Sequence, residues 1–345
     1  MKPQFRILSI DGGGIRGILP CTILAFIEKQ LGYPLSQVFD LIAGTSAGGI
    51  ITMGLSAPNN DGQNAYAADD LRELFVKNGS KIFSKRQEDL ISRLASITKI
   101  TDMIFQKPYD ERDFEMLLTD YFGKSKLSDG LTSTLVTSYE IQKGKPFYFS
   151  SRLARNDKAE DFSMKEVCRS TSAAPVYFEP SVVKFTEASN LALVDGGVFA
   201  NNPSILAYSE AKELWKIRTG KGFEPVVRPD DDDLPFFMLS IGTGFCLKTI
   251  PLIEAKEWRA VNWGKFLTDI FMRSVTESTD FTMAHLLPSY VDGSFRYKRL
   301  NISIPEENSK MDDVSEENLE KLCEISDDYV KKNEKELLKI CDILS

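Results

Sequence analysis

Short apolar runs alternate along this chain with longer segments whose apolar residues recur every three or four positions. The short runs predict strands, at residues 5–10, 38–43, 134–142, 146–150, 182–185, 191–194, 236–241 and 295–302. The helical spacing predicts helices, at residues 18–30, 46–56, 70–78, 88–97, 110–121, 165–172, 203–215, a helix-rich region at 258–287 and a final helix at 316–344. Strands that alternate with helices predict an α/β fold, with a mainly parallel sheet flanked by helices.

Glycine-rich turns follow four of the predicted strands, after Ile10, Ala43, Val194 and Ile241. Sheets of this kind bind ligands at the carboxyl ends of their strands, and glycine permits close backbone approach there. We therefore expect the four turns to lie on one rim and to form one site. Without repeats or low-complexity tails, residues 1–345 are expected to form a single domain. About 5–205 would carry the motifs and 206–345 would complete the fold.

Composition narrows the classes of partner. The 345 residues are 42% hydrophobic and 27% charged, with a net charge of -8 and no basic stripe, which argues against a nucleic-acid binder. An acidic surface also disfavours tight electrostatic adhesion to anionic membranes, so any contact with lipid should be hydrophobic and transient. Five widely spaced cysteines without a CxxC pair predict neither disulfides nor a zinc site. We see no signal peptide and no transmembrane run, and expect a cytoplasmic protein.

The candidate nucleophile is Ser46, in the sequence G-T-S-A-G at residues 44–48. It matches the G-x-S-x-G pattern, in which a serine sits on a sharp turn between a strand and a helix. The flanks of such a turn must be small, and Ala47, Gly48 and Gly49 meet that need. Helix amides beside the serine would favour developing negative charge. The alternative is that Ser46 only caps the helix.

A glycine loop, D-G-G-G-I-R-G at residues 11–17, follows the first strand. The backbone N–H groups of Gly12, Gly13 and Gly14 could point inward as an oxyanion hole, which acyl transfer requires. Arg16 could fix this loop or help neutralise the oxyanion. The loop also fits the G-x-G-x-x-G dinucleotide fingerprint, but the acidic residue that should end the second strand is missing, because Asp40 lies near its start.

Serine needs a base, and the chain has a single histidine, His285. The order Ser46, Asp195, His285 is that of an α/β-hydrolase triad. His285, however, lies near the end of an amphipathic segment that reads as a structural helix end. Asp195, in D-G-G at residues 195–197, directly follows an apolar strand and could approach a serine closely, although Asp-Gly is also a common turn pair.

These three motifs, in this order and at these distances, resemble the patatin-like phospholipase family. Further segments resemble it at residues 170–178, 200–203, 239–244 and 297–300, so that the resemblance covers about residues 5 to 345. It implies a three-layer sandwich and a lipid acyl hydrolase of the phospholipase A type, with no metal and no cofactor. It also implies a Ser46–Asp195 dyad without histidine, an oxyanion hole at Gly12, Gly13 and Gly14, and supporting roles for Arg16, Gly44, Gly48 and Gly196.

The chain's size and its DGGGIRGILP opening look closest to the bacterial anti-phage effectors of this family, which cyclic dinucleotides activate. A cyclic dinucleotide is therefore a candidate activator, and membrane phospholipid at the inner face the expected substrate. Basic residues at 81–93 and 152–158 are candidate phosphate ligands, and solubility explains them equally well. Apolar stretches at 97–105 and 263–272 are either a lid or core. The alternatives are a constitutive esterase, a protein acyl hydrolase, or a catalytically silent nucleotide sensor.

Overall fold

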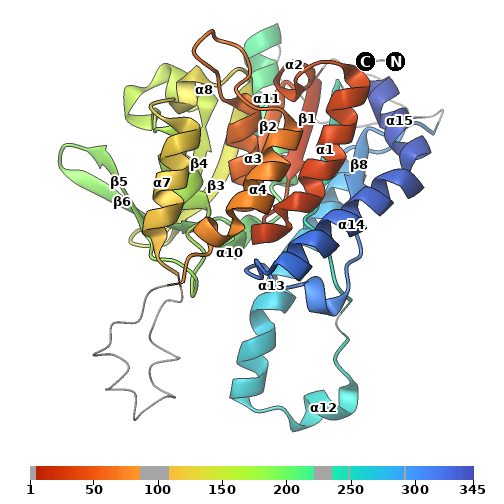
Figure 1. Cartoon of the computed structure of the whole chain (residues 1–345). Helices are drawn as coiled ribbons and strands as arrows, with labels where there is room; N and C mark the ends of the chain where they lie inside the picture. Colours follow the sequence, from red (N-terminus) through yellow and green to blue (C-terminus); the bar gives the residue numbers. More distant parts are fainter. Residues whose placement is uncertain (1–4, 86–108, 221–234, 248, 291–292) are drawn as a thin grey trace.

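The computed structural model describes residues 5–85, 109–220, 235–247, 249–290 and 293–345. One sheet runs through it (Figure 1), with strands β1 (Phe5–Ile10), β2 (Leu41–Thr45), β3 (Ser133–Glu140), β4 (Lys145–Ser150), β5 (Ser181–Thr186), β6 (Ser189–Asp195), β7 (Phe236–Ile241) and β8 (Tyr297–Leu300). The strand order is β5-β6-β3-β2-β1-β7-β8, and β4 pairs with β3. β8, β7, β1, β2 and β3 are parallel, which confirms the predicted mainly parallel sheet.

Helices cover both faces of the sheet and give the molecule three layers. One face is covered by α1 (Ile18–Leu31), α3 (Ala47–Ser56), α4 (Ala68–Ile82), α7 (Glu111–Phe122), α9 (Met164–Thr171), α14 (Glu316–Lys332) and α15 (Glu334–Leu344). The other face is covered by α11 (Ser204–Thr219) and α13 (Ala260–Leu286). The shorter helices are α2 (Leu35–Val38), α8 (Ser151–Asn156), α10 (Gly197–Ala200) and α12 (Leu252–Glu257), and the 3-10 turns are η1 (Gly14–Gly17), η3 (Leu127–Asp129), η4 (Lys158–Glu160) and η5 (Glu306–Asn308).

The two faces of β1 show why the sheet must be buried on both sides. Leu8 and Ile10 pack into the larger core, under α1 and α3, while Phe5 and Ile7 pack into the smaller core, against α11. Successive side chains of a strand point to opposite faces, so a strand that is apolar at nearly every position needs helices on both sides. The continuous apolar run of the sequence is therefore explained by the three-layer arrangement.

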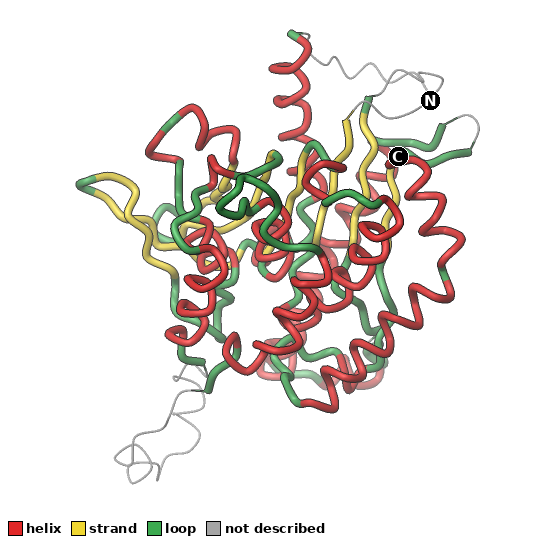
Figure 2. Tube along the Cα trace, turned by 45° about the horizontal axis from the view of Figure 1, so that its top comes forward, coloured by secondary structure: helices red, strands yellow, loops and turns green. Residues whose placement is uncertain are grey.

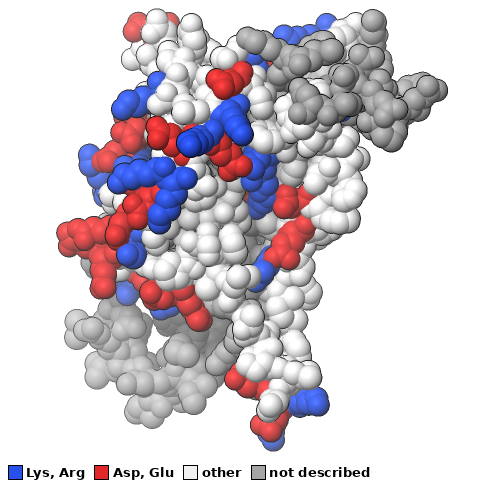
Figure 3. Space-filling model, turned by 90° about the vertical axis from the view of Figure 1, so that its right-hand side faces the viewer, with Lys and Arg blue, Asp and Glu red and all other residues white. Residues whose placement is uncertain are grey.

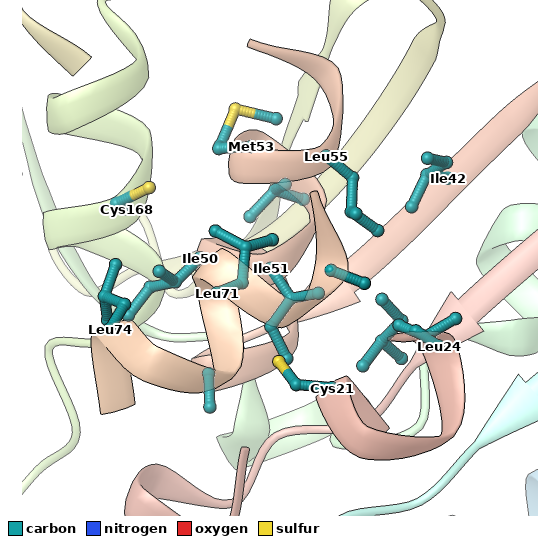
Figure 4. Packing of buried hydrophobic residues seen from close by; sticks show 14 of the residues in the cluster. Cys21, Leu24, Ile42, Ile50, Ile51, Met53, Leu55, Leu71, Leu74 and Cys168 are labelled. Carbon is teal, nitrogen blue, oxygen red and sulfur yellow. The ribbon is translucent and has the colours of Figure 1, made fainter. Parts of the chain in front are cut away.

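The helix α3 lies at the centre of the larger core. All ten of its residues are buried, and Figure 4 shows Ile50 and Ile51 between side chains of α1 and α4, among them Cys21 and Leu71. Burial raises the pKa of the Cys21 thiol well above its ordinary value, so this cysteine stays protonated and acts as a small apolar residue. The chain's five cysteines form no disulfide with one another. A fully buried helix fixes the position of the residue that precedes it, and for α3 that residue is Ser46.

Several predicted boundaries shift by a few residues, and two of the differences have a clear structural reason. The strand predicted at 38–43 begins later, as β2, because Pro34 starts the short helix α2 just before it. The final helix predicted at 316–344 is two helices, α14 and α15, which meet at Asn333. The helix predicted at 88–97 and the apolar stretch at 97–105 lie outside the described residues.

Within the described ranges, no helix is both long enough and apolar enough to cross a bilayer.

Candidate active site

Ser46 occupies the predicted turn between β2 and α3. It has a left-handed backbone, with φ 54, and its side chain is half-buried. Ser46 holds the N-cap position of α3, but its side chain makes no capping hydrogen bond. The alternative that Ser46 only caps a helix therefore fails to account for this residue. A Cβ on Gly48 would come within 2.3 Å of the Ile10 carbonyl oxygen, so the tight turn requires glycine there.

Asp195 ends β6 and is only 4% exposed. Its Oδ1 accepts a hydrogen bond of 2.7 Å from the Gly197 N–H, and the Ser46 side chain lies beside its carboxyl group and favours the ionised form. Burial raises the pKa of Asp195 to about 6, and these two neighbours oppose that rise. The structure thus brings the predicted nucleophile and the predicted base into direct contact, with the base poised near neutral pH.

The edge of β3 explains how the two residues meet. Along this strand, residues 133–137 pair with β2, and the pairing ends where Thr45 lies opposite Thr137. The next residue, Ser138, lies opposite Asp195 of β6. β4 occupies the other edge of β3 throughout this stretch, so β2 and β6 meet end to end along one edge. Ser46 and Asp195 stand at that junction.

The four glycine-rich turns do meet at one site, as expected, but β6 reaches it from the opposite direction. The strands β1, β2 and β7 do run parallel and end together. The strand β6 is antiparallel to β3, and it approaches from beyond the carboxyl end of β3 as part of the β5–β6 hairpin. That hairpin extends from the side of the molecule in Figures 1 and 2. Asp195 reaches the site because β6 runs inward and stops level with the end of β2.

Three threonines hold this junction, and the motif analysis assigned none of them a role. The Ser46 N–H donates a 2.8 Å hydrogen bond to Thr171 Oγ1, which itself donates to the Thr137 carbonyl. Thr45 Oγ1 lies 2.7 Å from Thr137 Oγ1 and donates to the Ala200 carbonyl in α10. A hydroxyl both donates and accepts, so threonines can link neighbouring chain segments where no ladder continues. The threonine residues lie in β2, β3 and α9, and no local sequence pattern groups them.

Close packing explains the glycines predicted to support the turn. A Cβ on Gly44 would lie 2.1 Å from the Gly48 carbonyl oxygen, and one on Gly196 would lie 2.1 Å from Thr137 Oγ1.

Strained backbone conformations also occur close to the site. Among the described residues, the non-glycine positions with positive φ are Ser46 and Val176. Val176 lies just beyond Ala173, whose carbonyl accepts the Asp195 N–H. Strained backbone of this kind clusters at functional sites.

The glycine loop follows β1 and lies directly beside Ser46. The Gly12 N–H donates to the Asn201 carbonyl at 3.1 Å, and the Gly12 carbonyl accepts from Thr243 Oγ1 at 2.6 Å. Gly14 needs its glycine, because φ is 58 and a Cβ would meet the Met311 carbonyl. Among the described residues, neither Gly13 nor Gly14 has a hydrogen-bond partner for its N–H. Gly12 thus fastens the loop, and the other two glycines keep donors available.

Side chains on both sides of the loop hold it. Arg16 Nε donates to the Gly13 carbonyl at 3.4 Å. Asp11, 2% exposed, pairs with Arg299 of β8, whose Nη1 also donates to Ser240 in β7. Burial alone would lower the pKa of the Arg299 guanidinium, but the Asp11 carboxylate more than offsets this, so the net shift is upward. Arg299 lies 288 residues after Asp11 in the sequence, and sequence analysis placed it only in a strand.

A cavity of about 630 Å³ opens beside the loop. The residues that line it include Asp11, Arg16 and Asn201, together with Ile270 and Met272 of α13. A larger cavity of about 790 Å³ lies between α1 and α4, and none of the predicted site residues lines it. Within the described ranges, no three His, Cys, Asp or Glu side chains are grouped to share a metal ion.

The remaining candidates lie apart from this chemistry. His285 is exposed near the end of α13, where its Nδ1 lies 2.7 Å from the Phe281 carbonyl oxygen of the same helix. Asp40 lies just before β2, where it binds the Arg6 N–H and Arg218, so it is far from the glycine end of the strand. Neither the triad with histidine nor the dinucleotide fingerprint gains support from these positions.

The fold and the serine turn together define an α/β acyl hydrolase. Residues 8–208 match the family described as patatin-like phospholipase, and the chain belongs to that family. Membership of this family implies a lipid acyl hydrolase, as the sequence motifs predict.

The relatives cover most of the chain. Patatin-like protein 2 of Arabidopsis thaliana is 31% identical over 344 residues, which cover 94% of this chain and 83% of the relative. Patatin group J-1 of Solanum tuberosum is 31% identical over 357 residues, covering 96% and 85%. Among solved structures, VipD from Legionella pneumophila is 13% identical, covering 95% of this chain and 67% of that chain, with a TM-score of 0.35. That likeness is too weak to add to the assignment.

The pair of Asp11 and Arg299 gives a test of how the loop is held. Replacing Arg299 with Met leaves a buried carboxylate without its partner, and should lower the free energy of unfolding by about 3 kcal/mol. The double variant Asp11→Asn/Arg299→Met should recover part of this loss, because no buried charge remains. Urea denaturation measures both changes.

Arg218→Met is the matched control. It breaks the half-exposed pair with Asp40, which should cost less than about 1 kcal/mol. A single Arg299→Met variant that is no less stable than this control would show that the buried pair does not hold the loop.

Proposed function

We propose that this protein hydrolyses acyl esters of lipids with Ser46 as nucleophile and Asp195 as its base. The observation that carries the proposal is the position of the Ser46 side chain beside the Asp195 carboxyl group, where burial raises the pKa of Asp195 to about 6. A serine hydroxyl attacks only when a base accepts its proton, and such a base works best with a pKa near the working pH. Family membership and the strained turn at Ser46 support the same assignment.

In the proposed mechanism, the ionised Asp195 carboxylate takes the proton of Ser46 as its Oγ attacks the ester carbonyl carbon. Negative charge then develops on the carbonyl oxygen, and the N–H groups of Gly13 and Gly14 are proposed to stabilise it. Asp195 next returns the proton to the departing alcohol, which leaves an acyl group on Ser46. Water, activated by the same carboxylate, releases the fatty acid and restores the serine.

The proposed substrate is a phospholipid, cleaved in the manner of a phospholipase A. The cavity beside the glycine loop supports this, because its lining combines apolar residues such as Ile270 and Met272 with polar ones such as Asp11 and Asn201. A mixed lining of this kind can accept both an acyl chain and the polar ester region. A protein acyl hydrolase or a small-ester hydrolase would use the same dyad and stands as the alternative.

Removing either member of the dyad should abolish activity. Ser46→Ala and Asp195→Ala should each lower kcat on a dissolved short-chain ester by about 10³-fold or more, because the residues act as one unit. The double variant should be no worse than either single one. Circular dichroism checks that the fold is retained.

His285→Ala is the control for this experiment, since the ring lies on the helix α13 and bonds to its own backbone. It should retain activity within about twofold. An inactive but folded His285→Ala enzyme would replace the dyad with a triad.

The pKa of Asp195 sets the expected pH dependence. Burial raises it to about 6, and the carboxyl group must be ionised to accept a proton. We therefore expect kcat/KM to rise with pH through about 6 and then to level, falling about tenfold for each pH unit below that point. Measurement between pH 4.5 and 8.5 on a dissolved ester tests this. A midpoint near 7 that disappears in His285→Ala would point to histidine instead.

The proposal extends to regulation through the resemblance of the opening segment to bacterial anti-phage effectors. A cyclic dinucleotide is proposed to activate the enzyme, and its phosphates would need basic or N–H donors. The predicted cluster at 152–158 offers little for this, because Arg152 pairs with Glu210 and Arg155 binds the Gly130 and Thr132 carbonyls. Most of the cluster at 81–93 lies outside the described residues.

Calorimetry against a panel of cyclic dinucleotides, run beside vesicle hydrolysis, tests this part of the proposal. Activation requires one ligand with higher affinity for the active state, so a single member should bind and should raise hydrolysis at least tenfold. Full activity in the unliganded protein, with no binding across the panel, would leave a constitutive lipid hydrolase.

A further inference from the structure

An apolar arm projects from the side of the molecule that carries the candidate site. We define it as residues 252–271, which comprise α12 and the first turns of α13. In Figure 1 these helices extend below α10, the short helix that directly follows Asp195. The exposed apolar side chains of the arm are Leu252, Ile253, Trp263, Leu267 and Phe271.

The exposed residues of α13 form a stripe rather than a scatter. Trp263, Leu267 and Phe271 are spaced by four residues, so they lie on one face of the helix. An apolar helix stripe normally packs on a core, and a contiguous exposed one marks an interaction surface. The stretch 263–272 was expected to be either a lid or part of the core. Instead, the face with Trp263, Leu267 and Phe271 meets solvent, while Ile270 and Met272 line the cavity.

The position of the stripe indicates what covers it. Phe271 lies in the helix between Ile270 and Met272, which both line the cavity beside Asp11, so a surface that buries Phe271 also lies next to the cavity. A second copy of the chain seated there would obstruct that side of the cavity. A lipid surface at the same place would instead bring lipid, the substrate class of this family, to the cavity.

The charge on the arm favours a neutral surface. α12 carries Glu254, Lys256 and Glu257, and Arg259 follows it, so the two signs balance. Figure 3 shows the projecting part mostly white, with charged groups of both signs near its tip. Trp258 and Trp263 form an edge-to-face pair at 5.1 Å, and tryptophan favours the boundary between lipid headgroups and acyl chains. Insertion should therefore depend on apolar burial and little on anionic lipid.

We propose that the apolar arm inserts into the surface of a phospholipid bilayer and presents the cavity beside Asp11 to lipid. This docking role rests on the proposed function for its purpose, but the binding itself requires no catalysis. The arm would lie in the interface without spanning it, as amphipathic helices do when one face is apolar.

Flotation of the full chain with phosphatidylcholine vesicles tests the proposal. The arm variant is Ile253→Ser/Phe271→Ser, whose side chains are 79% and 62% exposed and do not line the cavity. The matched control is Val182→Ser/Ile217→Ser, 69% and 66% exposed on β5 and α11. We expect the arm variant to lose at least about tenfold in vesicle binding, since each side chain buries substantial apolar area on insertion. The control should bind like the unchanged protein.

Hydrolysis separates docking from chemistry. The arm variant should lose vesicle hydrolysis in parallel with binding, and should keep its rate on a dissolved short-chain ester within about twofold. Ser46→Ala should float as well as the unchanged protein. If the unchanged protein floats through its arm but hydrolyses neither vesicles nor the dissolved ester, the proposed function fails and the docking proposal stands.

Two results would overturn the docking proposal. One is an arm variant that floats as well as the control. The other is light scattering that finds a dimer which the arm variant converts to a monomer, since the stripe would then be an interface between copies.

Discussion

The shared edge of β3 is the constraint on which the candidate site depends. Two strands that run in opposite directions meet end to end along it, so that Thr45 and Asp195 face successive residues of β3. Backbone ladders fix strand positions to a fraction of a residue, and a slip of one position would turn Asp195 to the other face of the sheet. The contact between Ser46 and Asp195 therefore rests on two sheet registers. The threonines at the junction bond the end of β2 to β3, α9 and α10.

The sequence predicted the parts of the site that local chemistry determines. A sharp turn needs small flanks and a close loop needs glycine, so G-T-S-A-G and D-G-G-G could be recognised without a structure. The β7 strand was predicted at its observed limits, because a fully buried strand is a continuous apolar run. What could not be predicted depends on distant pairing. Nothing near Arg299 in the sequence marks it as the partner of Asp11, and the inward direction of β6 follows only from its pairing with β3.

The helix α13 has apolar residues in two different environments, which its sequence pattern does not distinguish. Some of its apolar residues line a cavity and others meet solvent, and both sets are apolar. Periodicity identifies a helix with an apolar face, yet it cannot say what that face contacts. Only the placement of α13 against β8 and α11 shows which residues are left uncovered.

The burial of Asp195 affects the folding stability of the whole protein. Its pKa rises from 3.8 to about 6 mainly through burial, so between these values the native state holds a proton that the unfolded chain has released. The stability associated with that proton is fully present below the unfolded pKa and is lost as pH rises through about 6. Above this point the folded protein carries a buried carboxylate, which Ser46 and the Gly197 N–H stabilise. The burial that would suit Asp195 to its proposed role as a base therefore lowers the stability of the folded protein.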